Sequence, residues 1–252
     1  MSILNRLTAF LAALMTFFSL QALFIWPNHI SFIAGANFLI ILWLWLNFTR
    51  PHILSRAMHG LIPVGLLASG YFFVIFLQTP QYRHITSVVV ALCLWLYLNI
   101  LYIFFYRPNQ YRPNSLELMS EYFNLVIGFF FFTGAFSLQV FLNYPRINLV
   151  VAAFIVTLLL IWQVFWVNKL SFDHSLVYGL IGATVLTEIF ASLLFLPTGY
   201  FVNSLAMTAC FYLYTNLCLA FLQKEFSPRN IFKYVLISSL SLILVLVTAN
   251  WT

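Results

Sequence analysis

Long apolar runs follow one another along the whole chain, and short polar segments separate them. A helix rises 1.5 Å per residue, so a run of about 18 residues or more crosses ~30 Å of hydrocarbon. The runs do not alternate apolar and polar residues as the strands of a membrane barrel do. The pattern therefore predicts nine transmembrane helices, at about residues 7–26, 30–48, 61–78, 85–106, 122–143, 147–167, 175–196, 200–223 and 231–250.

The segments between these runs are short and rich in Pro, Asn, Gly and charged residues, such as "WPNH", "NYPRIN" and "LPTGY". Such residues end helices and form turns. Connections this short predict that neighbouring helices run antiparallel. The longest segment, Arg107 to Glu121, lies near the middle of the chain.

Composition narrows the class further. Of the 252 residues, 63% are hydrophobic and 6% are charged, with a mean hydropathy of +1.00. A soluble domain has about 25% charged residues, so most of this surface must face lipid. The sequence predicts an all-α membrane protein, with the lipid bilayer and other membrane proteins as its partners.

The net charge of +6 favours membrane orientation over nucleic-acid binding, because the basic residues lie between the apolar runs. With nine spans, nine of the eleven Lys and Arg residues fall on the side of the N-terminus, and only Arg83 and Arg146 fall on the other. Positive residues favour the cytoplasm. We therefore expect a multi-pass protein of the cytoplasmic (inner) membrane with a cytoplasmic N-terminus and an external C-terminus.

The first apolar run also has features of a cleaved signal peptide, since it follows Arg6 and contains the small-residue text "SLQA". Its apolar part is long for a signal core, and "FSLQ" recurs deep inside the chain. We interpret this run as a retained span.

The text "FSLQ" occurs at Phe18 and again at Phe136, each time with Pro six positions after the Gln. At a nearly equal offset, "CLWLYLN" from Cys93 matches "CFYLYTN" from Cys210. These matches predict two parallel four-helix repeats related by a pseudo-twofold axis along the membrane normal. We expect repeats at 1–112 and 113–226, and a C-terminal ninth helix at 227–252.

Few polar residues lie inside the predicted spans. Glu188 is placed near the midplane, where a charged carboxylate costs ~2.5–3.5 kcal/mol, so it should be neutral, paired or water-facing. Tyr71 is its counterpart in the first repeat. Gln21 and Gln139 lie at one depth near the external ends of their spans, and an interhelical hydrogen bond explains them better than a substrate path. Six residues are therefore candidates to line a substrate path: Glu188, Tyr71, Gln21, Gln139, Asn99 and Asn216.

Other chemistry has little support in the sequence. The cysteines lie within apolar runs, and the five histidines, among them His52 and His59, lie in predicted polar segments without the spacing of a zinc helix. Catalytic triads, phosphate loops and paired aspartates are absent from the sequence. We expect no metal, no cofactor and no enzymatic activity.

The run Leu193 to Tyr214, which contains Leu-Pro-Thr-Gly-Tyr-Phe-Val-Asn at 196–203, and the closing "LVTANWT" carry a resemblance. Mainly over residues 188–252, the chain resembles a family of uncharacterised multi-spanning bacterial membrane proteins. The resemblance implies a bacterial inner-membrane setting and no catalytic or binding residues.

Three functions are compatible with these features. The first is a non-catalytic membrane scaffold or assembly subunit, whose polar residues lock helices together. The second is a small-solute transporter with a path between the repeats near Glu188. An intramembrane lipid-modifying enzyme is the weakest of the three. The absence of a polar helix face favours the scaffold.

Overall fold

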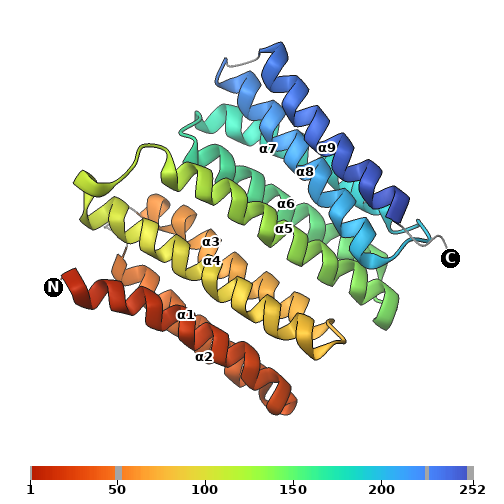
Figure 1. The fold of residues 1–252 in the computed structure, drawn as a ribbon. Helices are drawn as coiled ribbons and strands as arrows, with labels where there is room; N and C mark the ends of the chain where they lie inside the picture. The colour runs from red at the N-terminus through yellow and green to blue at the C-terminus, as the bar shows by residue number, and fades with distance from the viewer. Residues whose placement is uncertain (1, 49–52, 225–226, 249–252) are drawn as a thin grey trace. The chain divides into compact units, whose positions relative to one another are not determined.

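The structure is a computed structural model that describes residues 2–48, 53–224 and 227–248. Over these residues it contains nine α-helices, two short 3-10 turns and no strand (Figure 1). The helices are α1 (Ser2–Ile25), α2 (Ile30–Phe48), α3 (Ile53–Ile75), α4 (Pro80–Tyr106), α5 (Ser115–Leu142), α6 (Arg146–Val167), α7 (Phe172–Leu193), α8 (Tyr200–Leu222) and α9 (Pro228–Thr248). Arg50, His52 and the C-terminal "ANWT" lie outside the described residues.

The predicted all-α membrane class is confirmed. Eight of the described helices, α1 to α8, are long and apolar enough to cross a membrane. In α9 the apolar stretch found among the described residues is shorter, Ile231–Ile243. The ninth span therefore stays a prediction.

Three helices begin earlier than the apolar runs indicated. Helix α3 begins at Ile53 rather than near 61, and α5 begins at Ser115 rather than near 122. Helix α4 begins at Pro80, after an extended Thr79. Proline is favoured at the first helical position because its missing N–H has no intrahelical partner there. The first turn of each of these helices contains one charged residue and extends the helix beyond its apolar part.

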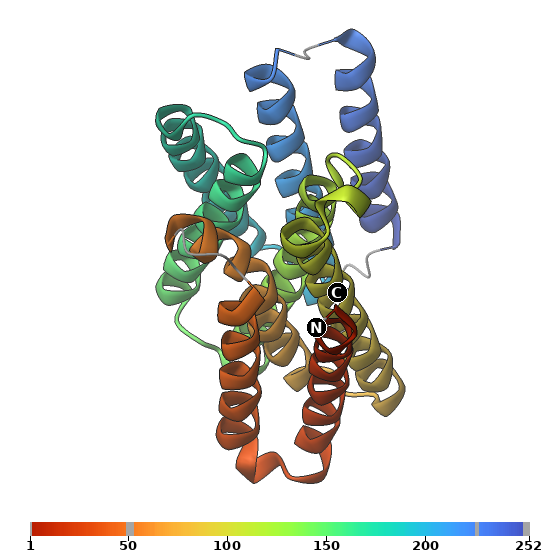
Figure 2. The same cartoon turned by 90° about the vertical axis from the view of Figure 1, so that its left-hand side faces the viewer.

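The chain folds into two compact units, Met1–Phe123 and Asn124–Thr252. In unit 1, α1 packs against α2 and α4, and α3 packs against α4. Figure 2 shows α1 and α2 as an antiparallel pair joined by a short 3-10 turn, Pro27–His29. The core of this unit is aliphatic for the most part, with fully buried Leu20, Ile41, Ile62, Leu66, Leu67 and Leu94.

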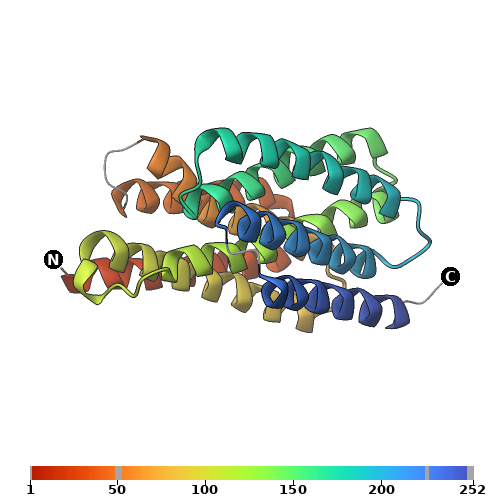
Figure 3. The same cartoon turned by 90° about the horizontal axis from the view of Figure 1, so that it is seen from above.

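In unit 2, α6 packs against α7, and α8 lies beside both α7 and α9; Figure 3 shows α8 and α9 side by side. The largest fully buried side chains of this unit are phenylalanines. The ring centroids of Phe136 and Phe190 are 4.7 Å apart, and those of Phe132 and Phe190 are 6.1 Å apart. The boundary between the units falls within α5, and the predicted repeat boundaries stay predictions.

Each unit contains a tyrosine hydrogen bond between its helices, with donors 117 positions apart. Tyr97 of α4 donates to the carbonyl of His59 on α3 at 3.1 Å. Tyr214 of α8 donates to the carbonyl of Tyr178 on α7 at 2.5 Å. In both units, therefore, a tyrosine ties the helix that carries the matched Cys-to-Asn text to the helix before it.

Candidate functional site

The six candidate path residues lie in several separate places. Gln21, Tyr71 and Asn99 belong to unit 1, whereas Gln139, Glu188 and Asn216 belong to unit 2. The bonds made by Gln21, Tyr71, Gln139 and Asn216 go to different partners, and no bond joins two of the six residues, all of which the structure describes.

Tyr71 belongs to a buried polar network that joins α1, α2 and α3. Its hydroxyl lies 2.6 Å from Ser19 Oγ. The Asn37 Nδ2 group donates to Ser19 Oγ at 2.9 Å and to the Tyr71 hydroxyl at 3.0 Å. Thr16 is fully buried beside this group, and its hydroxyl donates to Ala12 O on its own helix. The network satisfies polar groups that would otherwise be buried without partners.

Both glutamines of the "FSLQ" text bond to another part of the chain, as expected for interhelical hydrogen bonds. Gln21 Oε1 of α1 lies 2.7 Å from His84 Nδ1 on α4. Gln139 Nε2 of α5 donates to the carbonyl of Leu194, the residue after α7, at 3.1 Å. The two bonds have different partners, so the shared text does not produce identical contacts.

The two asparagines are half-buried. Asn99 lies on α4, and Asn216 donates from Nδ2 to the Tyr212 carbonyl of its own helix, α8, at 2.9 Å. A bond to the preceding turn satisfies the amide within the helix. It does not tie α8 to a neighbour.

Glu188 is exposed on α7, and its carboxyl makes no hydrogen bond or ion pair with a residue that the structure describes. The sequence placed it near the midplane, but α7 ends at Leu193. Glu188 is therefore ~8 Å from the C-terminal end of its helix. Its insertion cost falls below that of a charge at the helix centre.

The exposed face around Glu188 is otherwise mostly apolar. At 100° per residue, Val177, Ile181, Thr184 and Glu188 follow one stripe along α7, and all four are exposed. The Thr184 hydroxyl donates to the Leu180 carbonyl of the same helix. Glu188 is thus the carboxyl-bearing residue of an apolar stripe, which we call the α7 stripe.

A polar pocket of about 410 Å³ lies in unit 2 at the end of α5 and the start of α8. Gln139 is the candidate path residue that lines it, and Glu188 does not. The lining of this pocket also contains the Leu-Pro-Thr-Gly-Tyr text, which carries the family resemblance. The lining residues are Phe136, Gln139, Val140, Asn143, Leu194, Leu196, Pro197, Thr198, Gly199, Tyr200 and Asn203.

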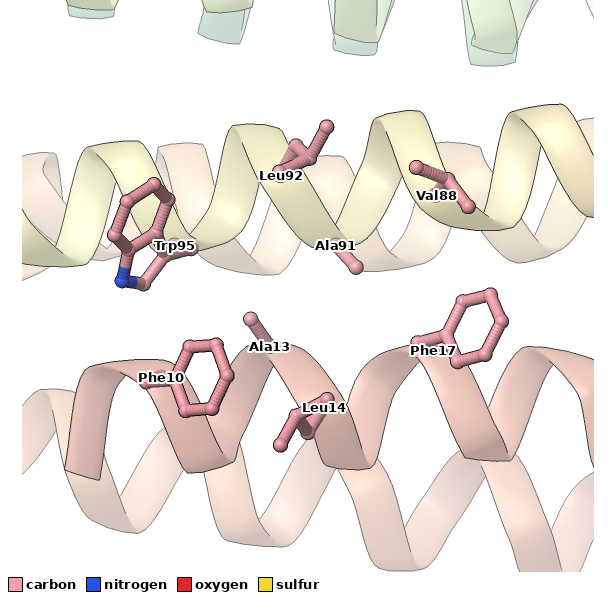
Figure 4. Close-up of a pocket in the computed structure, with 8 residues that line it drawn as sticks. All are labelled: Phe10, Ala13, Leu14, Phe17, Val88, Ala91, Leu92 and Trp95. Atoms are coloured by element: carbon pink, nitrogen blue, oxygen red, sulfur yellow. The ribbon is translucent and has the colours of Figure 1, made fainter. Parts of the chain in front are cut away.

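An apolar groove of about 330 Å³ lies between α1 and α4 in unit 1. Figure 4 shows its walls, with Phe10, Leu14 and Phe17 on one helix and Val88, Leu92 and Trp95 on the other. Such a lining offers mainly van der Waals contacts. The groove suits hydrocarbon and gives a polar solute nothing to bind.

The sequence does not predict two buried polar features, the Asn124–Gln163 pair and the buried His59. Asn124 and Gln163 are fully buried, and Asn124 Nδ2 donates to Gln163 Oε1 between α5 and α6. The prediction that His59 lies in a polar segment was wrong: it is buried on α3, 5.7 Å from the ring of Phe105. The early start of α3 brings this histidine into the helix.

A small hydrogen-bonded group joins the linker before α5 to the first turn of that helix. The Tyr111 hydroxyl donates to Glu117 Oε2 at 2.9 Å and accepts the Leu116 backbone N–H at 3.1 Å. Burial raises the pKa of Tyr111 above its ordinary value, and the Glu117 carboxylate raises it further, while the Leu116 bond acts in the opposite direction. This arrangement anchors the linker to the first turn of α5.

Among the described residues, no three His, Cys, Asp or Glu side chains are grouped so as to hold a metal ion. The three cysteines are free and half-buried. The fold and these sites together define a multi-pass α-helical membrane protein with polar groups that join its helices.

The chain belongs to the family described as protein of unknown function DUF5656, whose model matches residues 45–248. The match confirms an uncharacterised family and extends well beyond the C-terminal third that carried the resemblance. Comparison with curated proteins and with solved structures found no match.

Proposed function

We propose that this protein is a non-catalytic scaffold or assembly subunit, and that its α7 stripe contacts a helix of another membrane protein. The observation that carries the proposal is the exposure of Glu188 among Val177, Ile181 and Thr184. A carboxyl on an apolar helix face is unfavourable in lipid. A partner helix that offers a hydrogen bond at the same depth removes that cost.

The internal polar groups support the same proposal. Tyr71, Gln21 and Gln139 are each bonded within the chain, so they hold its own helices together. Glu188 has no such bond with a described residue. The hydrogen-bonding capacity of its carboxyl group is therefore available to a helix of another protein.

The substitutions Glu188→Leu and Glu188→Gln test this proposal. We expect Glu188→Leu to weaken the assembly about 3- to 30-fold, because one interhelical hydrogen bond of ~0.6–2 kcal/mol is lost. Glu188→Gln keeps a hydrogen-bonding group and should leave the assembly close to wild type. The measurement is the size of the complex extracted from native membranes in mild detergent, over a range of protein concentrations.

The matched control is Ile155→Leu on the exposed face of α6, which should not change the complex. A wild-type protein that is extracted as a monomer contradicts the proposal. An unchanged complex with Glu188→Leu contradicts it as well.

A small-solute transporter is the second candidate, because Gln139 lines the polar pocket of unit 2. The same pair of variants separates the two functions. A proton-coupled path through Glu188 requires a titrating group, so Glu188→Gln would abolish uptake. A scaffold tolerates this change.

We also propose that the protein resides in a bacterial inner membrane with a cytoplasmic N-terminus and an external C-terminus. The charge distribution supports this orientation. The matched tyrosine bonds of Tyr97 and Tyr214 support the proposal that the chain arose from two copies of a four-helix unit.

A further inference from the structure

The polar pocket of unit 2 is built at one end of three membrane-spanning helices. Helix α5 ends at Leu142, α7 ends at Leu193 and α8 begins at Tyr200. The pocket therefore lies near the membrane interface, where both a dissolved molecule and a lipid headgroup can reach it. Its volume of about 410 Å³ falls within the ordinary range for small-ligand sites.

Hydrogen bonds fix the walls of this pocket. Gln139 Nε2 donates to Leu194 O at 3.1 Å, and Asn203 Nδ2 donates to Leu193 O at 3.2 Å. The Thr198 hydroxyl donates to Asn203 Oδ1. Side chains held in this way do not need to be ordered when a ligand binds, which reduces the entropic cost of binding.

Several lining groups keep unused hydrogen-bonding capacity. Gln139 Oε1, the Asn143 side-chain amide and the Tyr200 hydroxyl make no hydrogen bond with residues that the structure describes. They supply both donors and acceptors. The rings of Phe136 and Tyr200 add apolar surface to the same lining.

The lining contains no charged side chain. An ionised ligand would lose hydration without gaining a charged partner, whereas hydroxyl groups can exchange water for amide and phenol groups. The guanidinium of Arg146 is nearby in sequence, but it lies 4.6 Å over the ring of Phe195, which does not line the pocket.

We propose that this pocket binds an uncharged, hydroxyl-rich group of the sugar or polyol class, presented either by a free molecule or by a lipid headgroup. Gln139, Asn143 and Tyr200 donate to and accept from its hydroxyls. This inference is independent of the assembly proposed for the α7 stripe, because Glu188 does not line the pocket.

Gly199 offers a direct test, because a Cβ added there meets no atom within 4 Å. Its backbone angles, φ −62° and ψ 146°, suit any residue. Because Gly199 lines the pocket, we expect the larger side chain of Gly199→Leu to take up space in it. Gly199→Ala, which adds the Cβ alone, is the matched control. Tyr200→Phe removes only the hydroxyl.

The experiment titrates the full-length protein in nanodiscs by calorimetry. The soluble probes are glycerol, inositol, glucose and maltose, and the lipid probe is a glucosyl diacylglycerol in phosphatidylcholine discs. We expect at least one probe to bind, with Gly199→Ala unchanged and Gly199→Leu weaker by about tenfold or more. Tyr200→Phe should weaken binding by about 2- to 10-fold.

Binding of the glucosyl lipid alone assigns a headgroup, and binding of a soluble probe assigns a free molecule. The proposal is overturned if no probe binds, if Gly199→Leu binds as wild type, or if glucose 6-phosphate binds more tightly than glucose. Thermal unfolding of each variant must match wild type; a destabilised Gly199→Leu is replaced by Gly199→Val under the same criteria.

Discussion

Gly182 lies on α7 at its contact with Tyr214 of α8. A Cβ at this position would overlap the Tyr214 ring. The Tyr214 hydroxyl reaches the Tyr178 carbonyl, one turn before Gly182 on α7, at 2.5 Å. The glycine therefore allows the ring to cross the helix and form the bond that ties α8 to α7.

The substitution Gly182→Ala should destabilise the protein by about 1–3 kcal/mol, because the ring must move and its bond to Tyr178 is lost. The better helix propensity of Ala offsets part of this cost. The measurement is reversible unfolding in mixed micelles.

Gly35→Ala on α2 is the control for the change in propensity, since a Cβ there meets nothing within 4 Å. It should leave stability unchanged or raise it slightly. Equal effects at the two glycines would contradict this account of Gly182.

At the level of the helices, apolar length predicted the number and approximate positions of all nine. It does not predict that α4 begins at Pro80, because a proline between two apolar runs can end one helix or be the first residue of the next. Apolar patterns describe which residues avoid water. They do not describe how far a polar first turn extends beyond the hydrocarbon.

The partners of polar residues were harder to predict. The repeat matches point to Tyr71 only as the counterpart of Glu188, and no sequence pattern points to Asn37, which completes the Tyr71 network. A lone amide in an apolar run shows that a partner is needed. The identity of the partner depends on helix rotation and pairing, which one sequence does not specify. The sequence requires Glu188 to be neutral, paired or water-facing, and for the same reason it does not show which of these holds; the structure exposes the side chain on α7.

The network of α1, α2 and α3 should behave as a coupled group. We expect Tyr71→Phe and Ser19→Ala each to cost about 0.6–2 kcal/mol of unfolding free energy. The double variant should cost less than the sum, because both changes remove the same 2.6 Å hydrogen bond. A double-mutant cycle from steric-trap or denaturant unfolding measures this coupling, and strict additivity would contradict it.

For the whole molecule, we infer a chain that crosses the membrane repeatedly from a cytoplasmic N-terminus. Three kinds of observation support it: eight helices of sufficient length and apolarity, connections of a few residues, and basic residues concentrated on one side. The orientation rests on the last of these alone. Labelling of the connections on either side of the membrane tests the orientation directly.

Substituted-cysteine labelling provides that measurement, in a variant whose three native cysteines are replaced by alanine. Single cysteines at the exposed positions Asn28, Asn109, Tyr144 and Lys224 report on four different connections. With a membrane-impermeant maleimide on sealed spheroplasts, a cytoplasmic N-terminus predicts labelling at 28 and 144, and labelling at 109 and 224 only after lysis. Labelling of 109 and 224 in sealed spheroplasts, or equal labelling of all four, would contradict it.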